Sequence, residues 1–99
     1  MKELRGKQRR YLKSLANQLK PVVYVGKEGI SPPLLRSIED AYNTSELIKI
    51  KIERNSPLDR KELGARLAEE TTSYLIQILG HTILLYRPDP EEARLQLPD

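Results

Sequence analysis

The chain has 99 residues, of which 38% are hydrophobic, and its 17 Lys and Arg against 14 Asp and Glu give a formal net charge of +3. This length suits one small domain with a single packed core and leaves no room for a second. The absence of cysteine excludes disulfides, thiolate zinc sites and thiol nucleophiles, and no apolar run resembles a membrane span or signal peptide, so we expect a cytoplasmic protein.

The first expected element is a basic amphipathic helix from about Glu3 to Leu19, which begins nearer Lys7 because Gly6 weakens the first turn. Its apolar side chains share one face: Leu4, Tyr11, Leu12, Leu15, Ala16 and Leu19. Residues 1–20 carry seven basic side chains and one acidic one, a local charge of +6, whereas the other 79 residues carry −3. Such a segment is typical either of a solvated helix face or of a surface that binds a polyanion.

A strand, a glycine loop and a helix are expected next. Pro21 ends the first helix, and the apolar run 22–25 is typical of a buried strand. Gly26-Lys27-Glu28-Gly29 follows directly. Ser31 and Pro32 have the pattern of an N-cap and a first helical position, which predicts a helix as far as Tyr42.

The second half predicts a strand, a helix and a hairpin. Residues 46–53 alternate, with Ile48, Ile50 and Ile52 on one face and Lys49 and Lys51 on the other, where we expect a solvated strand face. Ser56 and Asp59 have the spacing of a capping box, which predicts that the next helix starts there. Two β-rich runs, 74–79 and 82–87, flank Gly80-His81, the pattern of a two-residue hairpin turn.

The element order α-β-α-β-α-β-β predicts a two-layer α/β fold with a four-stranded mixed sheet. The first three strands should run in the same direction because each β-α-β connection is long enough for a crossover. Ile83-Leu84-Leu85 is apolar on both faces, so the fourth strand should lie inside the sheet. We expect residues 1–88 to form the domain and residues 89–99, which are rich in Pro and acid, to form a mobile tail.

Side chains for catalysis are scarce, and we expect no enzyme activity, cofactor, metal site or small-molecule substrate. The single histidine, His81, falls in the hairpin turn, where an exposed turn residue is the ordinary role. Gly26 and Lys27 do not form a nucleotide P-loop, because the upstream glycine and the following Ser or Thr are missing. The G-x-x-G segment is compatible with a tight turn at positive φ or with a backbone clamp for phosphate, and the preceding basic helix favours the clamp.

The aromatic residues indicate how such a clamp would bind. Five Tyr are spread one per element, and the chain has no Phe or Trp, so the paired aromatics of a base-stacking sheet are not expected. Tyr11, which lies among basic residues, is the tyrosine for which stacking is considered. Contacts should therefore be mainly to phosphates, with little sequence discrimination.

Several segments, taken together, resemble a known family far more specifically than any one of them does. They are Gly6-Lys7-Gln8-Arg9-Arg10-Tyr11-Leu12, Leu15-Ala16, Lys20-Pro21, Val25-Gly26-Lys27-Glu28-Gly29-Ile30, Glu46-Leu47-Ile48-Lys49-Ile50, and Gly80 with Leu84-Leu85-Tyr86-Arg87. From Leu4 to Pro88 they resemble the CRM domain, the YhbY-like family of RNA-binding modules. The resemblance implies a fold similar to the C-terminal domain of translation initiation factor three, with strand order 1-2-4-3. Bacterial members of the family associate with precursors of the large ribosomal subunit, and plant organelle members act in group II intron splicing.

The resemblance also implies a site. The family's RNA loop falls on Gly26, Lys27, Glu28 and Gly29, to which we add Ile30, and the basic helix alongside is expected to contribute Lys7, Arg9, Arg10, Lys13 and Lys20. The predicted function is that of a monomeric protein that grips structured RNA and acts in assembly of the large ribosomal subunit, with precursor rRNA as its partner. The alternative is a protein-interaction adaptor whose basic helix docks on an acidic protein surface.

Overall fold

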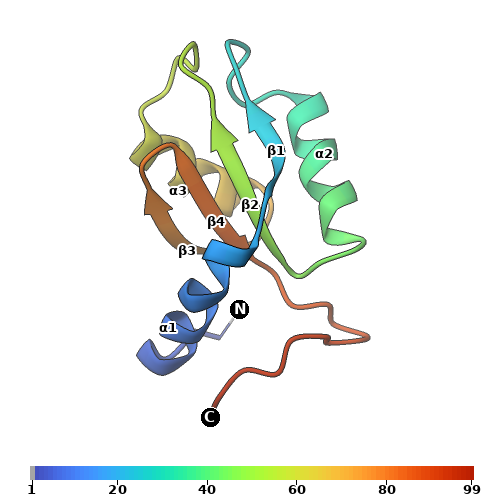
Figure 1. Cartoon of the computed structure of the whole chain (residues 1–99). Coiled ribbons are helices and arrows are strands. Elements are labelled where there is room, and N and C mark those ends of the chain that lie inside the picture. The colour runs from blue at the N-terminus through green and yellow to red at the C-terminus, as the bar shows by residue number, and fades with distance from the viewer. Residues whose placement is uncertain (1) are drawn as a thin grey trace.

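The computed structural model describes residues 2–99, and within them the elements follow the predicted order (Figure 1). A first helix and a short 3-10 turn precede two β-α units and a final β-hairpin, with these bounds: α1 Gly6–Leu15, η1 Ala16–Gln18, β1 Pro21–Val25, α2 Pro32–Tyr42, β2 Leu47–Ile52, α3 Arg60–Glu70, β3 Tyr74–Leu79 and β4 Thr82–Tyr86. The α/β class predicted from the sequence is therefore confirmed.

The four strands form one mixed sheet in the order β1-β2-β4-β3. β1 pairs with β2 in parallel, whereas β4 runs antiparallel to both β2 and β3, so the first three strands share one direction. Both the order and the central position of β4 agree with the prediction. The hairpin is also confirmed, because Gly80 at φ 58° joins β3 to β4.

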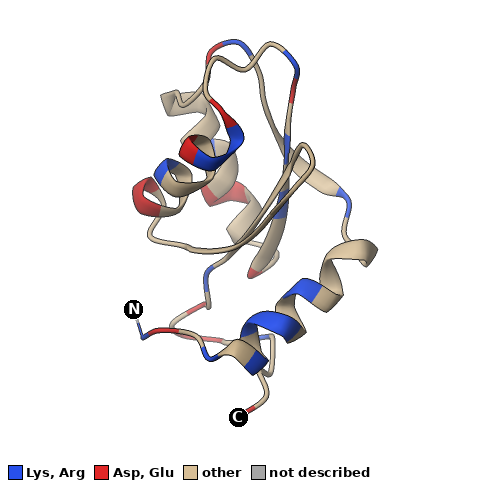
Figure 2. Cartoon of the chain, turned by 90° about the vertical axis from the view of Figure 1, so that its left-hand side faces the viewer, with Lys and Arg blue, Asp and Glu red and all other residues tan. Residues whose placement is uncertain are grey.

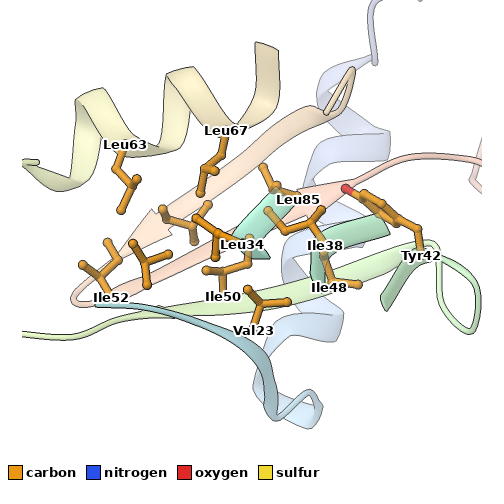
Figure 3. Close-up of a cluster of buried hydrophobic side chains, with 12 residues drawn as sticks. Val23, Leu34, Ile38, Tyr42, Ile48, Ile50, Ile52, Leu63, Leu67 and Leu85 are labelled. Carbon is orange, nitrogen blue, oxygen red and sulfur yellow. The ribbon is translucent and has the colours of Figure 1, made fainter. Parts of the chain in front are cut away.

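Helices α2 and α3 cover one face of the sheet and build the larger core (Figure 3). Ile48, Ile50 and Ile52 project from β2 into this core because alternate strand residues share a face. Leu63 and Leu67 of α3 meet them from the opposite layer, and both are fully buried. The predicted apolar face of β2 is thus the core face.

Within residues 2–99, the opposite face of the sheet is covered at one end, mainly by α1. Leu12 and Ala16 pack there on a smaller cluster of sheet residues formed by Leu47, Ile76, Leu84 and Tyr86. In Figure 2 the sheet is seen close to edge-on, with α2 and α3 on one side and α1 at the lower end of the other. We call the part of this face that α1 leaves uncovered the open face; it comprises Tyr24, Lys49, Lys51, Gln77, Leu79 and Thr82, all half-buried or exposed.

Two local predictions were wrong. β1 is not a buried strand, because it lies at the edge of the sheet with helices on only one side, and Val22 and Tyr24 are 57% and 55% exposed. Ser56 does not begin α3. The N-cap is Asp59, whose carboxylate accepts a hydrogen bond of 2.8 Å from the Lys61 amide, so the helix starts three residues later than the capping-box pattern indicated.

The segment after β4 runs back along the end of the molecule that carries α1 (Figure 1). The carboxylate of Glu46, only 3% exposed, accepts hydrogen bonds of 2.6–2.7 Å from the backbone amides of Asp89, Arg94 and Leu95. Leu95 and Leu97 pack against the α1 cluster. A single buried carboxylate therefore organises the path of residues 89–95.

Candidate nucleic-acid interface

The glycine loop between β1 and α2 is a closed turn. The Gly29 amide donates to the Gly26 carbonyl over 3.0 Å, which brings Lys27 and Glu28 to the tip, where both are exposed. Gly29 adopts φ +62°, and a Cβ placed on it would lie 3.2 Å from Pro57 Cγ. Both observations require glycine here, so the tight-turn role that the sequence allowed is part of the structure.

The backbone N–H groups of the loop differ in whether they already have a hydrogen-bond acceptor. Among residues 2–99, none accepts a hydrogen bond from the amides of Lys27, Glu28 or Ile30, whereas the Gly29 amide is used by the turn. The Ser31 hydroxyl accepts from the Leu34 amide over 3.3 Å, which confirms the predicted N-cap, and Pro32 and Pro33 have no N–H to offer. An anion at this loop therefore meets the tip amides and the Lys27 ammonium, not the helix end.

Two residues of the predicted loop site, Ile30 and Glu28, lie in environments that differ from that of the exposed, basic Lys27. Ile30 is half-buried and packs against the main core, so its side chain anchors the loop. Glu28 is exposed at the tip and places a carboxylate beside the free amides. The loop therefore combines one cation with one opposing charge.

The basic helix divides into free and engaged cations. Lys7, Arg10 and Lys13 are exposed on α1, and Lys20 is exposed where the chain enters β1. Arg9 differs, because its guanidinium is half-buried and Nη1 donates to the Leu75 carbonyl on β3 over 3.0 Å. That carbonyl lies where the pairing of β3 with β4 shifts register, so Arg9 fastens α1 to an irregular edge strand.

The loop and the basic helix lie at opposite ends of β1 (Figure 1). β1 has five residues, which at about 3.3 Å per residue separate the two ends by about 16 Å. The sequence had placed the helix beside the loop because the two are close along the chain. The structure brings together Lys27 and Glu28, and separately the cations of α1, but it does not merge the two groups.

A hollow of about 680 Å³ lies between the loop, the edge strand β1 and the first turns of α2. Val22 and Tyr24 line it from the strand, Lys27 from the loop, Pro33 and Ser37 from α2, and Glu53 and Asn55 from the turn after β2. It opens to solvent along the free edge of the sheet. The loop is thus one wall of a wider concave surface.

The tyrosines occupy environments that the sequence did not distinguish. Tyr74 and Tyr86 stack on each other with ring centroids 5.9 Å apart, and Tyr42 is buried. Tyr11, which the sequence singled out, is half-buried, whereas Tyr24 is the most exposed of the five. Alternation along β1 points to Tyr24 once the strand is known to be at an edge, and that position was the missing information.

A charged and aromatic cluster at the C-terminal end of α2 is structural. The guanidinium of Arg87 makes two hydrogen bonds of 2.8 Å to Glu39 and lies 4.2 Å from the ring centre of Tyr42. The bond from Arg87 lowers the pKa of Glu39. Burial raises the pKa of Tyr42 to about 12, partly opposed by its hydrogen bond with Ser73.

Residues 2–99 show neither a metal-binding cluster nor a membrane-spanning helix. Their His, Asp and Glu side chains do not gather in groups of three that could hold a metal ion. None of the helices in this part of the chain is long and apolar enough to cross a membrane.

A small α/β domain with a glycine loop before α2 and a basic helix before β1 defines a class of module, and comparison with known proteins identifies it. The CRS1/YhbY (CRM) domain matches residues 4–87, and the chain belongs to that family.

Relatives match over nearly the whole chain. The "Probable RNA-binding protein YqeI" of Bacillus subtilis is 36% identical over 96% of this chain and 99% of its own length. An "RNA-binding protein" of Haemophilus influenzae is 40% identical over 99% and 98%, respectively. The solution structure of the hypothetical protein SAV1595 from Staphylococcus aureus has a TM-score of 0.80 and 41% identity, and the match covers 97% of this chain and 100% of that one.

A plant protein matches over a smaller share of its length. The chloroplastic CRS2-associated factor 2 of rice is 32% identical over 81% of this chain, a match that takes up 13% of the plant protein. The module therefore also occurs as one part of much longer chains.

Proposed function

We propose that this protein binds structured RNA through the backbone and Lys27 of the glycine loop and through the exposed cations of α1. The family and the names of the two bacterial relatives support RNA as the partner. The observation that carries the proposal is the loop itself, whose tip carries an exposed lysine and backbone amides that have no acceptor among residues 2–99. Unpaired amides in a glycine turn can donate to the oxygen atoms of a phosphodiester.

The two basic regions have different tasks. The loop holds one backbone phosphate at short range, with Gly26 and Gly29 shaping the turn and Lys27 supplying charge. Lys20, about 16 Å from the loop at the other end of β1, and Lys7, Arg10 and Lys13 on α1 beyond it attract further phosphates. Because these contacts go to the RNA backbone, affinity depends on shape and salt more than on sequence.

A finer form of the proposal concerns the RNA. The family resemblance supports precursor rRNA of the large ribosomal subunit as the partner and ribosome assembly as the process. Ultraviolet crosslinking in cells, followed by sequencing of the attached RNA, tests this form: reads concentrated at one large-subunit rRNA site are expected, and reads spread over unrelated transcripts would contradict it.

Binding itself is tested with purified protein and a small RNA hairpin. Fluorescence anisotropy should show an affinity that falls steeply with KCl, with a log-log slope of about −3 or steeper, because four to six phosphates at about 0.7–0.9 each are within reach. A slope shallower than about −2 would contradict the phosphate clamp. The Lys27→Ala variant should bind more weakly, and Lys61→Ala, an exposed lysine on α3, is the matched control.

The adaptor remains the second candidate, and one observation favours it: α1 is an exposed cationic helix that is separate from the loop. Purification from cells with and without nuclease separates the two functions. An RNA-binding protein loses its associated material on nuclease treatment, whereas an adaptor retains a protein partner.

A further inference from the structure

Two of the three large exposed hydrophobic side chains of residues 2–99 lie on the open face of the sheet. They are Tyr24 and Leu79, with exposed fractions of 55% and 61%. Val23 and Val25 point into the main core, so Tyr24 between them points to the other face, whereas Val22 lies in the register shift between Pro21 and Val23, where alternation assigns no face. Scattered exposed apolar side chains are ordinary, so the surroundings of Tyr24 decide whether it marks a contact surface.

Strand register places Tyr24 next to a lysine. Tyr24 is the partner of Lys51 in the parallel pair of β1 and β2, and Lys51 is in turn the partner of Thr82 on β4. Neighbouring strands are about 4.8 Å apart, so the Lys51 side chain leaves the sheet next to that of Tyr24 and on the same face. Lys49 follows on the same side of β2, toward α1. The open face therefore has an aromatic ring at its edge and cations along its middle.

This surface lies between the two basic regions. Tyr24 lines the same hollow as Lys27, and Lys20 immediately precedes the other end of β1. A strand of RNA that contacts both ends must cross about 16 Å of β1, which corresponds to roughly five stacked nucleotides at about 3.4 Å each. Tyr24 lies on that path.

We propose that the open face is a subsite for unpaired nucleotides, in which a base stacks on Tyr24 and the adjoining phosphate pairs with Lys51. This inference rests on the proposed RNA-binding function. Nucleic acid fits the surface better than an acidic peptide does, because a ring with an adjacent cation matches a base with its phosphate. Glu53, which lies beyond Lys51 on the same side of the strand, limits the subsite at the loop end.

The test compares two RNA probes on the full chain. One is a blunt hairpin, and the other is the same hairpin with a five-nucleotide single-stranded extension. The wild type should bind the extended probe about tenfold more tightly, since stacking of one base on an aromatic side chain has an effect of this order. Tyr24→Ala should abolish this advantage and change blunt-hairpin binding by less than about twofold, whereas Tyr24→Phe should preserve it.

Two further variants complete the design. Leu79→Ala removes an equally exposed hydrophobic side chain on the far edge strand and should leave the advantage intact. Lys51→Gln should reduce the salt slope for the extended probe by about 0.7, the value for one single-strand phosphate, and leave the slope for the blunt probe unchanged. Circular dichroism confirms that each variant is folded.

The possible failures are distinguishable. If the wild type binds neither probe, the proposed function itself is wrong. If it binds both probes equally, or if folded Tyr24→Ala keeps the tenfold advantage, RNA binding stands and the subsite is refuted. If Tyr24→Phe loses as much as Tyr24→Ala, the hydroxyl and not the ring is responsible, which also refutes stacking.

Discussion

The division of the α1 cations into free and engaged groups leads to a prediction that the sequence alone would not make. Replacing Lys7, Arg10 and Lys13 together by Gln removes three exposed charges and leaves the packed face of the helix intact. Replacing Arg9 by Gln removes instead a charged hydrogen bond of 3.0 Å to the Leu75 carbonyl. The first change should affect RNA binding, and the second should affect stability.

The triple variant should change the salt dependence of RNA binding, whereas Arg9→Gln should change the free energy of unfolding. Three lost phosphate contacts reduce the log-log salt slope by about 2.1 to 2.7, so that between 50 and 200 mM KCl the affinity of the triple variant falls about 20- to 40-fold less than that of the wild type. A hydrogen bond from a charged group contributes about 1.5–3 kcal/mol, and partial exposure reduces this to about 1–2 kcal/mol for Arg9→Gln. The resulting decrease in Tm is about 4–8 °C per kcal/mol for a domain of this size.

Anisotropy titrations at four KCl concentrations and thermal melts measure the two quantities on the same preparations. Arg10→Gln is the matched single control for Arg9→Gln, since it removes the same side chain from the neighbouring position. The reasoning would be refuted if Arg9→Gln changed the salt slope as much as Arg10→Gln did while leaving Tm unaltered. An unchanged slope in the triple variant would remove α1 from the RNA surface altogether.

Four further predictions follow from particular contacts. Glu28→Lys should tighten RNA binding and steepen its salt dependence, whereas Lys27→Glu should weaken binding strongly; in a correctly folded protein, weaker binding by Glu28→Lys would mean that the carboxylate contacts RNA directly. Gly29→Ala should lower the free energy of unfolding by about 1–2 kcal/mol in urea titrations, because φ is +62° and Pro57 is close, and a neutral result would contradict the turn geometry. Glu46→Gln should release the segment after β4, because the wild-type carboxylate accepts hydrogen bonds from three of its amides. Hydrogen exchange of these amides should become faster in the variant. Unchanged protection would show that Leu95 and Leu97 hold the segment in place instead. Stability should fall between pH 10 and about 12 by up to about 3 kcal/mol, because unfolded tyrosine ionises near pH 10 whereas folded Tyr42 keeps its proton to about 12, and Tyr42→Phe should remove this part of the alkaline loss.

Local sequence signals determined most of the secondary structure. The Ser31 cap and the prolines after it define the start of α2 through contacts within three residues, and Gly80 defines the hairpin through its own backbone angle. The apolar run at Ile83 to Leu85 predicted that β4 is central, because a strand that is apolar on both faces must be covered on both. The family resemblance then supplied the complete strand order, which the structure confirms.

Only the tertiary structure decided which side chains are free to bind. The run 22–25 looks buried in the sequence, but the exposure of Tyr24 depends on having β2 on one side of β1 and no strand on the other. Arg9 and Arg10 are indistinguishable as letters, and what separates them is a carbonyl 66 positions away. Periodicity reports the contacts that a residue makes with its neighbours along the chain. Exposure, the pairing of charges and the separation of loop and helix by the length of β1 arise when distant segments come into contact, and these contacts form only when the sheet is assembled.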